Sequence, residues 1–295
     1  MKACSGAGRK NAYVNLALCI LLWASIPVIT KKMLLELNSL QILFYSTALS
    51  TLVMAILALS RKKAADWRQY GKKEYAIMAG LGLLGNYLYY LFLYGALSKT
   101  TAAEGFILAY TWPILVLLLS VVFGTDKLTV KKLAGMLVSF CGIIIITTQG
   151  ELTQFNLTNL NGDLLAIVGA FVFALFSVLA KRFDFDKIIS VFIYFLSAFM
   201  AIVPTVLAFS TIPLPGSDVW PWIIFNGVFV NGISYVFWFK ALAGGETHIL
   251  SNLLYVTPFI SLLYIALFLN EPILPSAIAG AVVIVSGVLF QYAKK

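Results

Sequence analysis

The chain consists largely of long apolar runs separated by short charged or turn-rich breaks. A helix needs roughly 20 apolar residues to cross the hydrocarbon core of a bilayer. Ten runs approach that length, near residues 12–32, 39–60, 73–96, 101–123, 129–148, 161–182, 187–210, 218–241, 247–269 and 273–293. We therefore expect an all-α integral membrane protein with ten transmembrane helices.

The composition excludes a soluble protein. Hydrophobic residues make up 61% of the chain and charged residues 11%, whereas a soluble chain carries roughly 25% charged residues. The basic N-terminus and the apolar run after it resemble a signal peptide, but the run continues to Thr30 without a small-residue cleavage site. We interpret this run as a retained first helix.

The placement of lysine and arginine predicts the orientation, because cytoplasmic loops of membrane proteins are enriched in these residues. With the N-terminus in the cytoplasm, 18 of the 21 fall on the cytoplasmic side and 3 on the outer side. We therefore predict a multi-pass protein of the plasma membrane (the inner membrane of a bacterium) with both termini cytoplasmic. The topology then explains the net charge of +9, and we expect no nucleic-acid partner.

One stretch of the chain occurs twice. YTWPILVLLLSVVF at 110–123 and YVTPFISLLYIALF at 255–268 share tyrosine, proline and phenylalanine at an offset of 145 residues. At this offset 14 of the 56 residues in 90–145 are identical to their counterparts in 235–290. We predict a first five-helix repeat at 1–149, an outer linker at 150–160 and a second repeat at 161–295, together forming one membrane unit. Because five is odd, the second repeat is inverted, and inverted repeats are typical of secondary transporters with a midplane site.

The centres of the expected spans contain polar, aromatic and helix-breaking residues. Trp23 and Trp112 are too deep for an interfacial belt of aromatic residues, and the repeat-related asparagines Asn86 and Asn231 lie at the same depth. Tyrosines accompany them, some in repeat-related pairs. They are Tyr90 with Tyr235, Tyr110 with Tyr255, and Tyr94. Such a set can bind an aromatic ring by stacking or an organic cation through ring faces, and the alternative is ordinary core packing.

Two prolines, Pro113 and Pro258, occupy matching positions in the fourth and ninth spans. Proline lacks the amide hydrogen, so we expect helix kinks that free the carbonyls of Ala109 and Leu254 toward a central cavity. The alternative is that prolines are simply common in transmembrane helices.

Glu104 opens the fourth span, where it can pair with an amine near the outer mouth or simply cap the helix. Matching small-residue stripes, Gly135/Gly142 and Gly280/Gly287, favour close helix packing within the bundle or between two copies. The sequence has no phosphate-binding loop, no usual zinc-ligand spacing and no hydrolase motif. We therefore expect no catalytic residue, no metal site and no cofactor.

Several segments resemble a known family. "LLWASIPVITKK" in the first span, a proline-and-phenylalanine helix followed by an acid, and then "AGAVVIVSGV" resemble the drug/metabolite transporter superfamily, EamA type. "AAEGFILAYTWPILVLLLS" and "WFKALAGGETHILSNLLYVTPFIS" are similar to segments of bacterial aromatic amino acid exporters. The resemblance implies pocket or gate roles for Glu104, Tyr110 and Trp112, with Tyr255 and Pro258 as their counterparts. Thr111 and Phe106 depart from that pattern.

The leading hypothesis is a secondary transporter, an exporter or facilitator of aromatic or related amino acids that works by alternating access. Its partners would be a small-molecule substrate and the lipid bilayer, and a homodimer is left open. One alternative is transport of another small metabolite or an organic cation such as choline or a drug. A further alternative is a polytopic membrane enzyme or scaffold.

Overall fold

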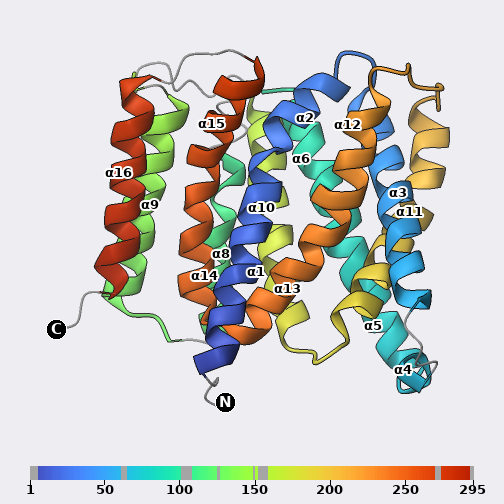
Figure 1. Cartoon of the computed structure of the whole chain (residues 1–295), viewed down its shortest axis with the longest axis horizontal. Coiled ribbons are helices and arrows are strands. Elements are labelled where there is room, and N and C mark those ends of the chain that lie inside the picture. The colour runs from blue at the N-terminus through green and yellow to red at the C-terminus, as the bar shows by residue number, and fades with distance from the viewer. Residues whose placement is uncertain are drawn as a thin grey trace.

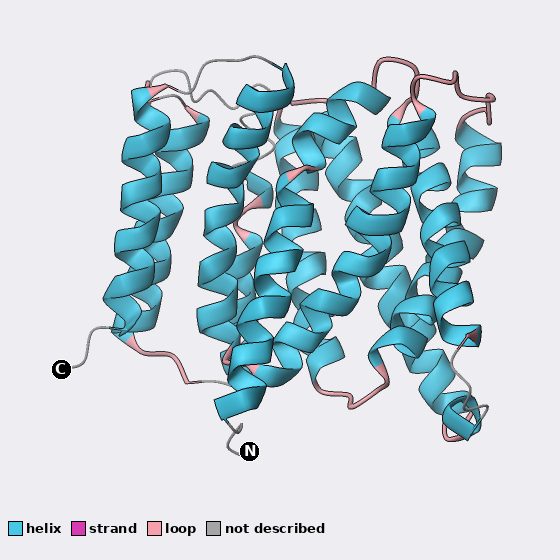
Figure 2. Cartoon of the chain, viewed as in Figure 1, coloured by secondary structure: helices cyan, strands magenta, loops and turns pink. Residues whose placement is uncertain are grey.

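The computed structural model describes residues 6–60, 65–100, 108–124, 127–148, 150–151, 159–269 and 274–292. Within these residues the chain contains helices joined by loops and turns, and no strand (Figure 2). Seven helical stretches are long and apolar enough to cross a membrane, and two shorter apolar helices cover Trp112–Val122 and Ile278–Phe290. The protein is therefore an all-helical, multi-pass membrane protein. The count of ten spans stays a prediction.

The described helices of the first half lie between Gly6 and Thr147. They are α1 (Gly6–Ala24), α2 (Ile26–Met33), α3 (Ser39–Leu59), α4 (Ala65–Arg68), α5 (Lys72–Gly82), the π-helical segment η1 (Leu83–Leu88), α6 (Tyr89–Leu97), α8 (Trp112–Val122) and α9 (Val130–Thr147).

The second half is also helical in the residues that the structure describes. It comprises α10 (Leu160–Lys181), α11 (Lys187–Phe209), α12 (Trp220–Phe225), the π-helical segment η3 (Asn226–Ile233), α13 (Ser234–Gly244), α14 (Thr247–Leu253), the 3₁₀ turn η4 (Leu254–Val256), α15 (Thr257–Leu269) and α16 (Pro275–Tyr292).

Several of these helices begin at a polar residue whose side chain caps the first turn. The Asn38 side chain accepts from the Gln41 backbone, and the Gln41 side chain accepts from the Asn38 backbone, which makes a capping box at the start of α3. Asp186 accepts from the backbone amides of Ile188 and Ile189 at the start of α11. These caps satisfy amides that the first turn of a helix leaves without partners.

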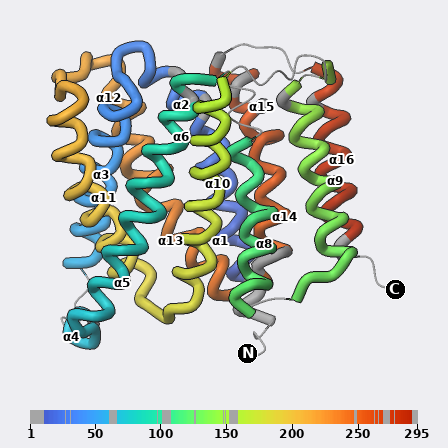
Figure 3. The backbone as a smooth tube through the Cα atoms, turned by 180° about the vertical axis from the view of Figure 1, so that it is seen from behind, coloured from blue at the N-terminus to red at the C-terminus, as the bar shows by residue number. Residues whose placement is uncertain are grey.

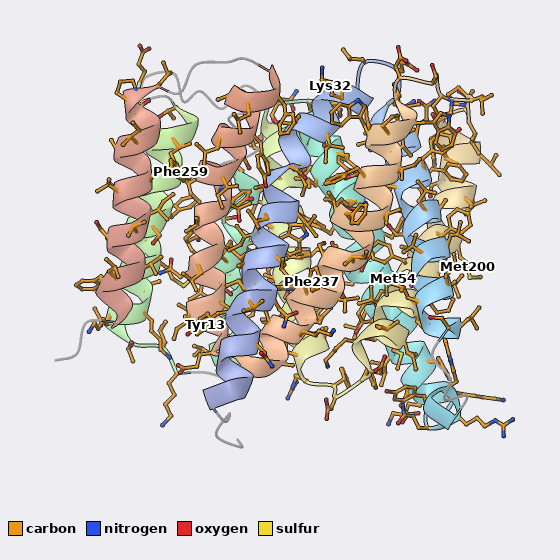
Figure 4. All side chains as sticks on the ribbon, viewed as in Figure 1. Tyr13, Lys32, Met54, Met200, Phe237 and Phe259 are labelled. Atoms are coloured by element: carbon orange, nitrogen blue, oxygen red, sulfur yellow. The ribbon has the colours of Figure 1, made fainter. Side chains whose placement is uncertain are left out.

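Large apolar side chains cover much of the outer surface. Met200 on α11 is 69% exposed, and Figure 4 shows it at an outer edge of the molecule. Leu59, Val122, Phe209 and Leu267 are at least 72% exposed. Such a surface suits lipid tails rather than water, because monomeric soluble proteins rarely expose large contiguous apolar patches.

Helices α9 and α16 form a closely packed pair at one edge of the molecule (Figures 1 and 3). A Cβ atom added to Gly142 would lie 2.6 Å from the Gly280 carbonyl oxygen, and one added to Gly287 would lie 2.5 Å from the Gly135 carbonyl oxygen. The small-residue stripes predicted from the sequence therefore pack against each other within one chain, since only glycine allows this approach.

Two further glycines make reciprocal contacts between the halves. A Cβ on Gly82 of α5 would lie 2.4 Å from the Tyr194 backbone of α11, and a Cβ on Gly227 of η3 would lie 2.6 Å from Leu49 of α3. The two glycines are 145 residues apart, the offset of the sequence repeat. Both bring a π-helical segment close to a helix of the opposite half.

Candidate functional site

Four buried rings from four helices meet in the middle of the molecule. Trp23 lies on α1, Trp112 on α8, Phe173 on α10 and Trp238 on α13, helices that are neighbours in both backbone views (Figures 1 and 3). The ring centroids of Trp112 lie 6.3 Å from Trp23, 5.7 Å from Trp238 and 4.9 Å from Phe173. The rings of Trp23 and Trp238 are 5.8 Å apart. We call these four residues the aromatic cluster.

The rings of the aromatic cluster meet mainly edge to face. The interplanar angle is 77° for Trp23 with Trp112 and 88° for Trp112 with Trp238. This geometry sets the positive edge of one ring against the negative face of the next and contributes about 0.5–1.5 kcal/mol per pair beyond burial. The cluster is therefore a specific arrangement of rings, not only a filled volume.

Two of the indoles donate hydrogen bonds to serine hydroxyls. Trp23 Nε1 donates to Ser234 Oγ at 2.8 Å, and Trp238 Nε1 donates to Ser177 Oγ at 3.4 Å. All four residues are buried, so an indole without a partner would carry the full cost of desolvation. The two bonds join α1 to α13 and α13 to α10.

A buried polar group adjoins the aromatic cluster. The Tyr235 hydroxyl donates to the Tyr90 hydroxyl at 3.1 Å, and the Tyr90 hydroxyl donates to Asn231 Oδ1 at 3.0 Å. The Tyr235 ring lies 6.0 Å from the Trp23 ring. Tyr94 extends this group, since it is 5% exposed and its ring lies 5.5 Å from that of Tyr90.

Two buried asparagine side chains, Asn86 four residues before Tyr90 and Asn231 four residues before Tyr235, retain unused hydrogen-bonding capacity. Asn86 is 0% exposed, and neither Oδ1 nor Nδ2 has a hydrogen-bond partner in the part of the chain that the structure describes. Asn231 Nδ2 has none there either. Because an unpaired polar group is costly inside a membrane protein, these amides are candidates for binding the polar atoms of a ligand.

The backbone changes its hydrogen-bond register where these asparagines lie. Asn86 belongs to η1 and Asn231 to η3, and each π-helical segment continues into an α-helix, α6 and α13, that carries Tyr90 or Tyr235. Short π-helical segments occur frequently at functional sites because they reorient side chains within a helix. The same device thus occurs at the same offset in both halves.

The repeat-related tyrosines Tyr110 and Tyr255 lie at a second buried cluster, and Tyr110 also lies near Tyr89, whose ring packs on Phe173. Tyr255 is buried in a separate cluster with Leu117, Met136 and Ile143, and Tyr110 packs against this cluster. The structure therefore brings together Trp23, Tyr90, Tyr94, Trp112, Asn231 and Tyr235, and places Tyr110 and Tyr255 beside α9 and α16. Glu104 lies outside the described residues.

Both predicted proline positions coincide with helix interruptions. A turn at Tyr110 and Thr111 precedes α8, whose second residue is Pro113. The 3₁₀ turn η4 precedes α15, whose second residue is Pro258. The Thr257 amide donates to the Leu254 carbonyl, so this carbonyl has a local partner where we had expected it to face a cavity.

Sequence reasoning missed Trp238 as a member of the aromatic cluster. At the repeat offset it corresponds to Leu93, so a search for matched aromatic residues passes over it. Its position three residues after Tyr235 was the available signal, because residues three apart share a helical face. Ser177 and Ser234, which hold the indoles, gave no signal of their own.

The aromatic cluster and its polar neighbours consist of rings, hydroxyls and amides. In the described residues, no group of three or more His, Cys, Asp and Glu side chains could hold a metal ion. What these side chains can do is hold a ring by edge and face contacts and hold polar atoms by hydrogen bonds.

Comparison with known proteins decides the family. Residues 10–148 and residues 160–293 each match the EamA-like transporter family. The chain belongs to this family. As a family member it is a transporter, and the two matched regions correspond to the two halves of the chain.

Relatives agree with this assignment. An uncharacterized transporter of Archaeoglobus fulgidus is 28% identical over 291 residues, which covers 97% of this chain and 98% of the relative. An uncharacterized transporter of Bacillus subtilis, YyaM, is 26% identical over 218 residues, or 71% of this chain and 70% of the relative.

One relative has a named substrate class, and one solved structure has the same fold. The aromatic amino acid exporter YddG of Ancylobacter novellus is 26% identical over 185 residues, or 62% of this chain and 64% of that protein. A solved crystal structure superposes with a TM-score of 0.84 at 20% sequence identity and covers 96% of each chain. The superposition shows that the fold is shared.

Proposed function

We propose that this EamA-family member moves aromatic or related amino acids by alternating access between two inverted five-helix halves. The observation that supports this most directly is the aromatic cluster together with the Tyr235–Tyr90–Asn231 hydrogen bonds. Its members come from both halves, as alternating access around a shared site requires. The likeness to an aromatic amino acid exporter supports the same substrate class.

The site is suited to an aromatic amino acid in two ways. The rings of Trp23, Trp112 and Trp238 provide edge and face contacts for an aromatic side chain. The amides of Asn86 and Asn231 provide donors and acceptors for its polar atoms. Tryptophan rings can also hold an organic cation, so choline belongs in any test of the substrate.

The proposed orientation has both termini in the cytoplasm of a bacterial cell. The start of α1 and the end of α16 lie at the same end of the molecule, and the basic connection between α10 and α11 lies there as well (Figure 1). A cytoplasmic end rich in lysine and arginine agrees with the rule for membrane insertion.

Uptake into proteoliposomes tests the function. We expect saturable uptake of labelled phenylalanine, tyrosine or tryptophan, and at least about tenfold lower uptake in Trp112→Ala, because this change removes a ring contacted by three others. Trp220→Ala is the matched control, since the Trp220 ring packs on Tyr45 outside the aromatic cluster.

Other outcomes would change the proposal. Uptake of threonine or choline without any aromatic amino acid would retain the transport site and reject the aromatic substrate. Equal losses in Trp112→Ala and Trp220→Ala would show that the substrate does not use the aromatic cluster.

A further inference from the structure

A second set of buried polar side chains lies on the interrupted helix α14–η4–α15. It comprises Ser251, Asn252, Tyr255 and Thr257, each at most 1% exposed. Within the described residues, Ser251 Oγ and both amide atoms of Asn252 have no hydrogen-bond partner. Three such atoms on two adjacent residues of one transmembrane stretch are unusual, since nearly all buried polar groups in proteins are paired.

These side chains face the corresponding interruption in the first half. The Tyr255 hydroxyl lies beside the backbone of Ile114, and Thr257 lies beside Tyr110. Ser251 and Asn252 precede Tyr255 by four and three residues, so they lie one turn away on the same side of the helix. Helix α14 packs against α8. The polar set therefore occupies the boundary between the two halves.

The unpaired atoms specify the kind of ligand. Asn252 Nδ2 can only donate, Asn252 Oδ1 can only accept, and the hydroxyls can do both. A bare cation would use the acceptors alone, and a simple anion would use the donors alone. A group that presents both a positive donor and a negative acceptor within a few ångströms would use all of them.

We propose that Ser251, Asn252 and Thr257 bind the ammonium and carboxylate groups of a free α-amino acid. The site lies where α14 meets α8, the helix that also carries Trp112 of the aromatic cluster. It deepens the proposed transport of amino acids and rests on that function. It does not depend on an aromatic side chain.

Thermal unfolding of the purified full chain with a set of related probes tests this site. The probes are phenylalanine, its methyl ester, 3-phenylpropionate, threonine and sodium chloride. We expect phenylalanine to raise the unfolding temperature, while the ester, which lacks the carboxylate, and phenylpropionate, which lacks the ammonium, do not. The half-saturating phenylalanine concentration should rise about tenfold in Asn252→Leu and in Thr257→Val, because a hydrogen bond to a charged group is lost.

Controls separate binding from folding. Thr47→Val changes an equally buried, unpaired threonine on α3 and should bind phenylalanine like the wild type. Thr257→Ser keeps the hydroxyl and should restore binding. Without ligand, Asn252→Leu should unfold at the same or a higher temperature than the wild type, because it removes an unpaired polar group. A purely structural role for Asn252 predicts the opposite.

The remaining outcomes either support or reject the proposed amino acid site. Phenylalanine binding within about twofold of wild type in both variants would overturn it, as would stabilisation by sodium chloride alone that the variants lose. Stabilisation by threonine but not phenylalanine would support it and would reject only the aromatic part of the proposed function. If no amino acid stabilises the wild type, this site is rejected, and the uptake assay decides the proposed function separately.

Discussion

At the scale of single residues, the centre of the molecule depends on a few hydrogen bonds that hold large rings. The Trp23 indole reaches across to Ser234, 211 residues further along the chain. This bond fixes the ring that touches Trp112, Phe173, Tyr235 and Trp238. A small side chain therefore determines the orientation of a large one.

Ser234→Ala should lower both stability and transport. It leaves the buried Trp23 N–H without a partner, which costs about 1–3 kcal/mol. We expect a lower unfolding temperature in detergent and reduced uptake in proteoliposomes. Ser286→Ala is the control, because the Ser286 hydroxyl is exposed and bonds only to the Val282 carbonyl of its own helix. If Ser234→Ala and the wild type unfold at the same temperature, Ser234 does not have the stabilising role assigned to it.

The sequence predicted part of the buried cluster that we propose as the site, for physical reasons. Trp23, Trp112 and Asn231 stood out because polar and interfacial residues are costly in the middle of a membrane span, and the structure brings them together. Trp238 could not be found by repeat matching, because the cluster is not symmetric. The π-helical segments η1 and η3 could not be predicted either, because hydropathy does not show which backbone carbonyl each amide donates to.

At the scale of helices, close glycine contacts set the spacing. Gly142 on α9 and Gly280 on α16 face each other with room only for hydrogen atoms. Gly82 and Gly227 bring η1 and η3 against helices of the opposite half in the same way. The fold class was predictable from the apolar runs, whereas these contacts between halves required the structure.

Gly142→Ala should destabilise the protein by about 1–3 kcal/mol, because the new methyl group would overlap the Gly280 carbonyl and Ile284. Gly80→Ala is the matched control. Gly80 lies on helix α5 with nothing within 4 Å of an added Cβ, so alanine should stabilise that helix by about 0.5–1 kcal/mol. Thermal unfolding of both variants checks the pair. An unchanged unfolding temperature for Gly142→Ala would mean that α9 and α16 can move apart without loss of stability.

At the scale of the whole molecule, charge and apolar surface together place the protein in the membrane. The exposed apolar side chains surround the helices, and the basic connections concentrate at one end of the bundle in the proposed orientation. A helix interruption precedes each of the two prolines, Pro113 and Pro258, that share the sequence offset of 145 residues.

Cysteine labelling tests the orientation. In a cysteine-free background, Asp218→Cys in the connection between α11 and α12 should react with a membrane-impermeant maleimide on intact cells. Asp184→Cys in the connection between α10 and α11 should react only after the membrane is opened. Both positions are exposed in the structure, so access to the reagent depends on the side of the membrane. The reverse pattern would place both termini outside.

The glycine contact between α9 and α16 also has a consequence for assembly. Each helix comes from a different family-matched region of the chain, and each uses its small residues on the other. The exposed surface of this helix pair carries larger aliphatic side chains, among them Leu137, Val282 and Leu289. Two separate copies of a half-length protein would have to find each other by diffusion in the bilayer. Here both helices belong to one chain, so α9 and α16 meet within one molecule and not through diffusion between copies.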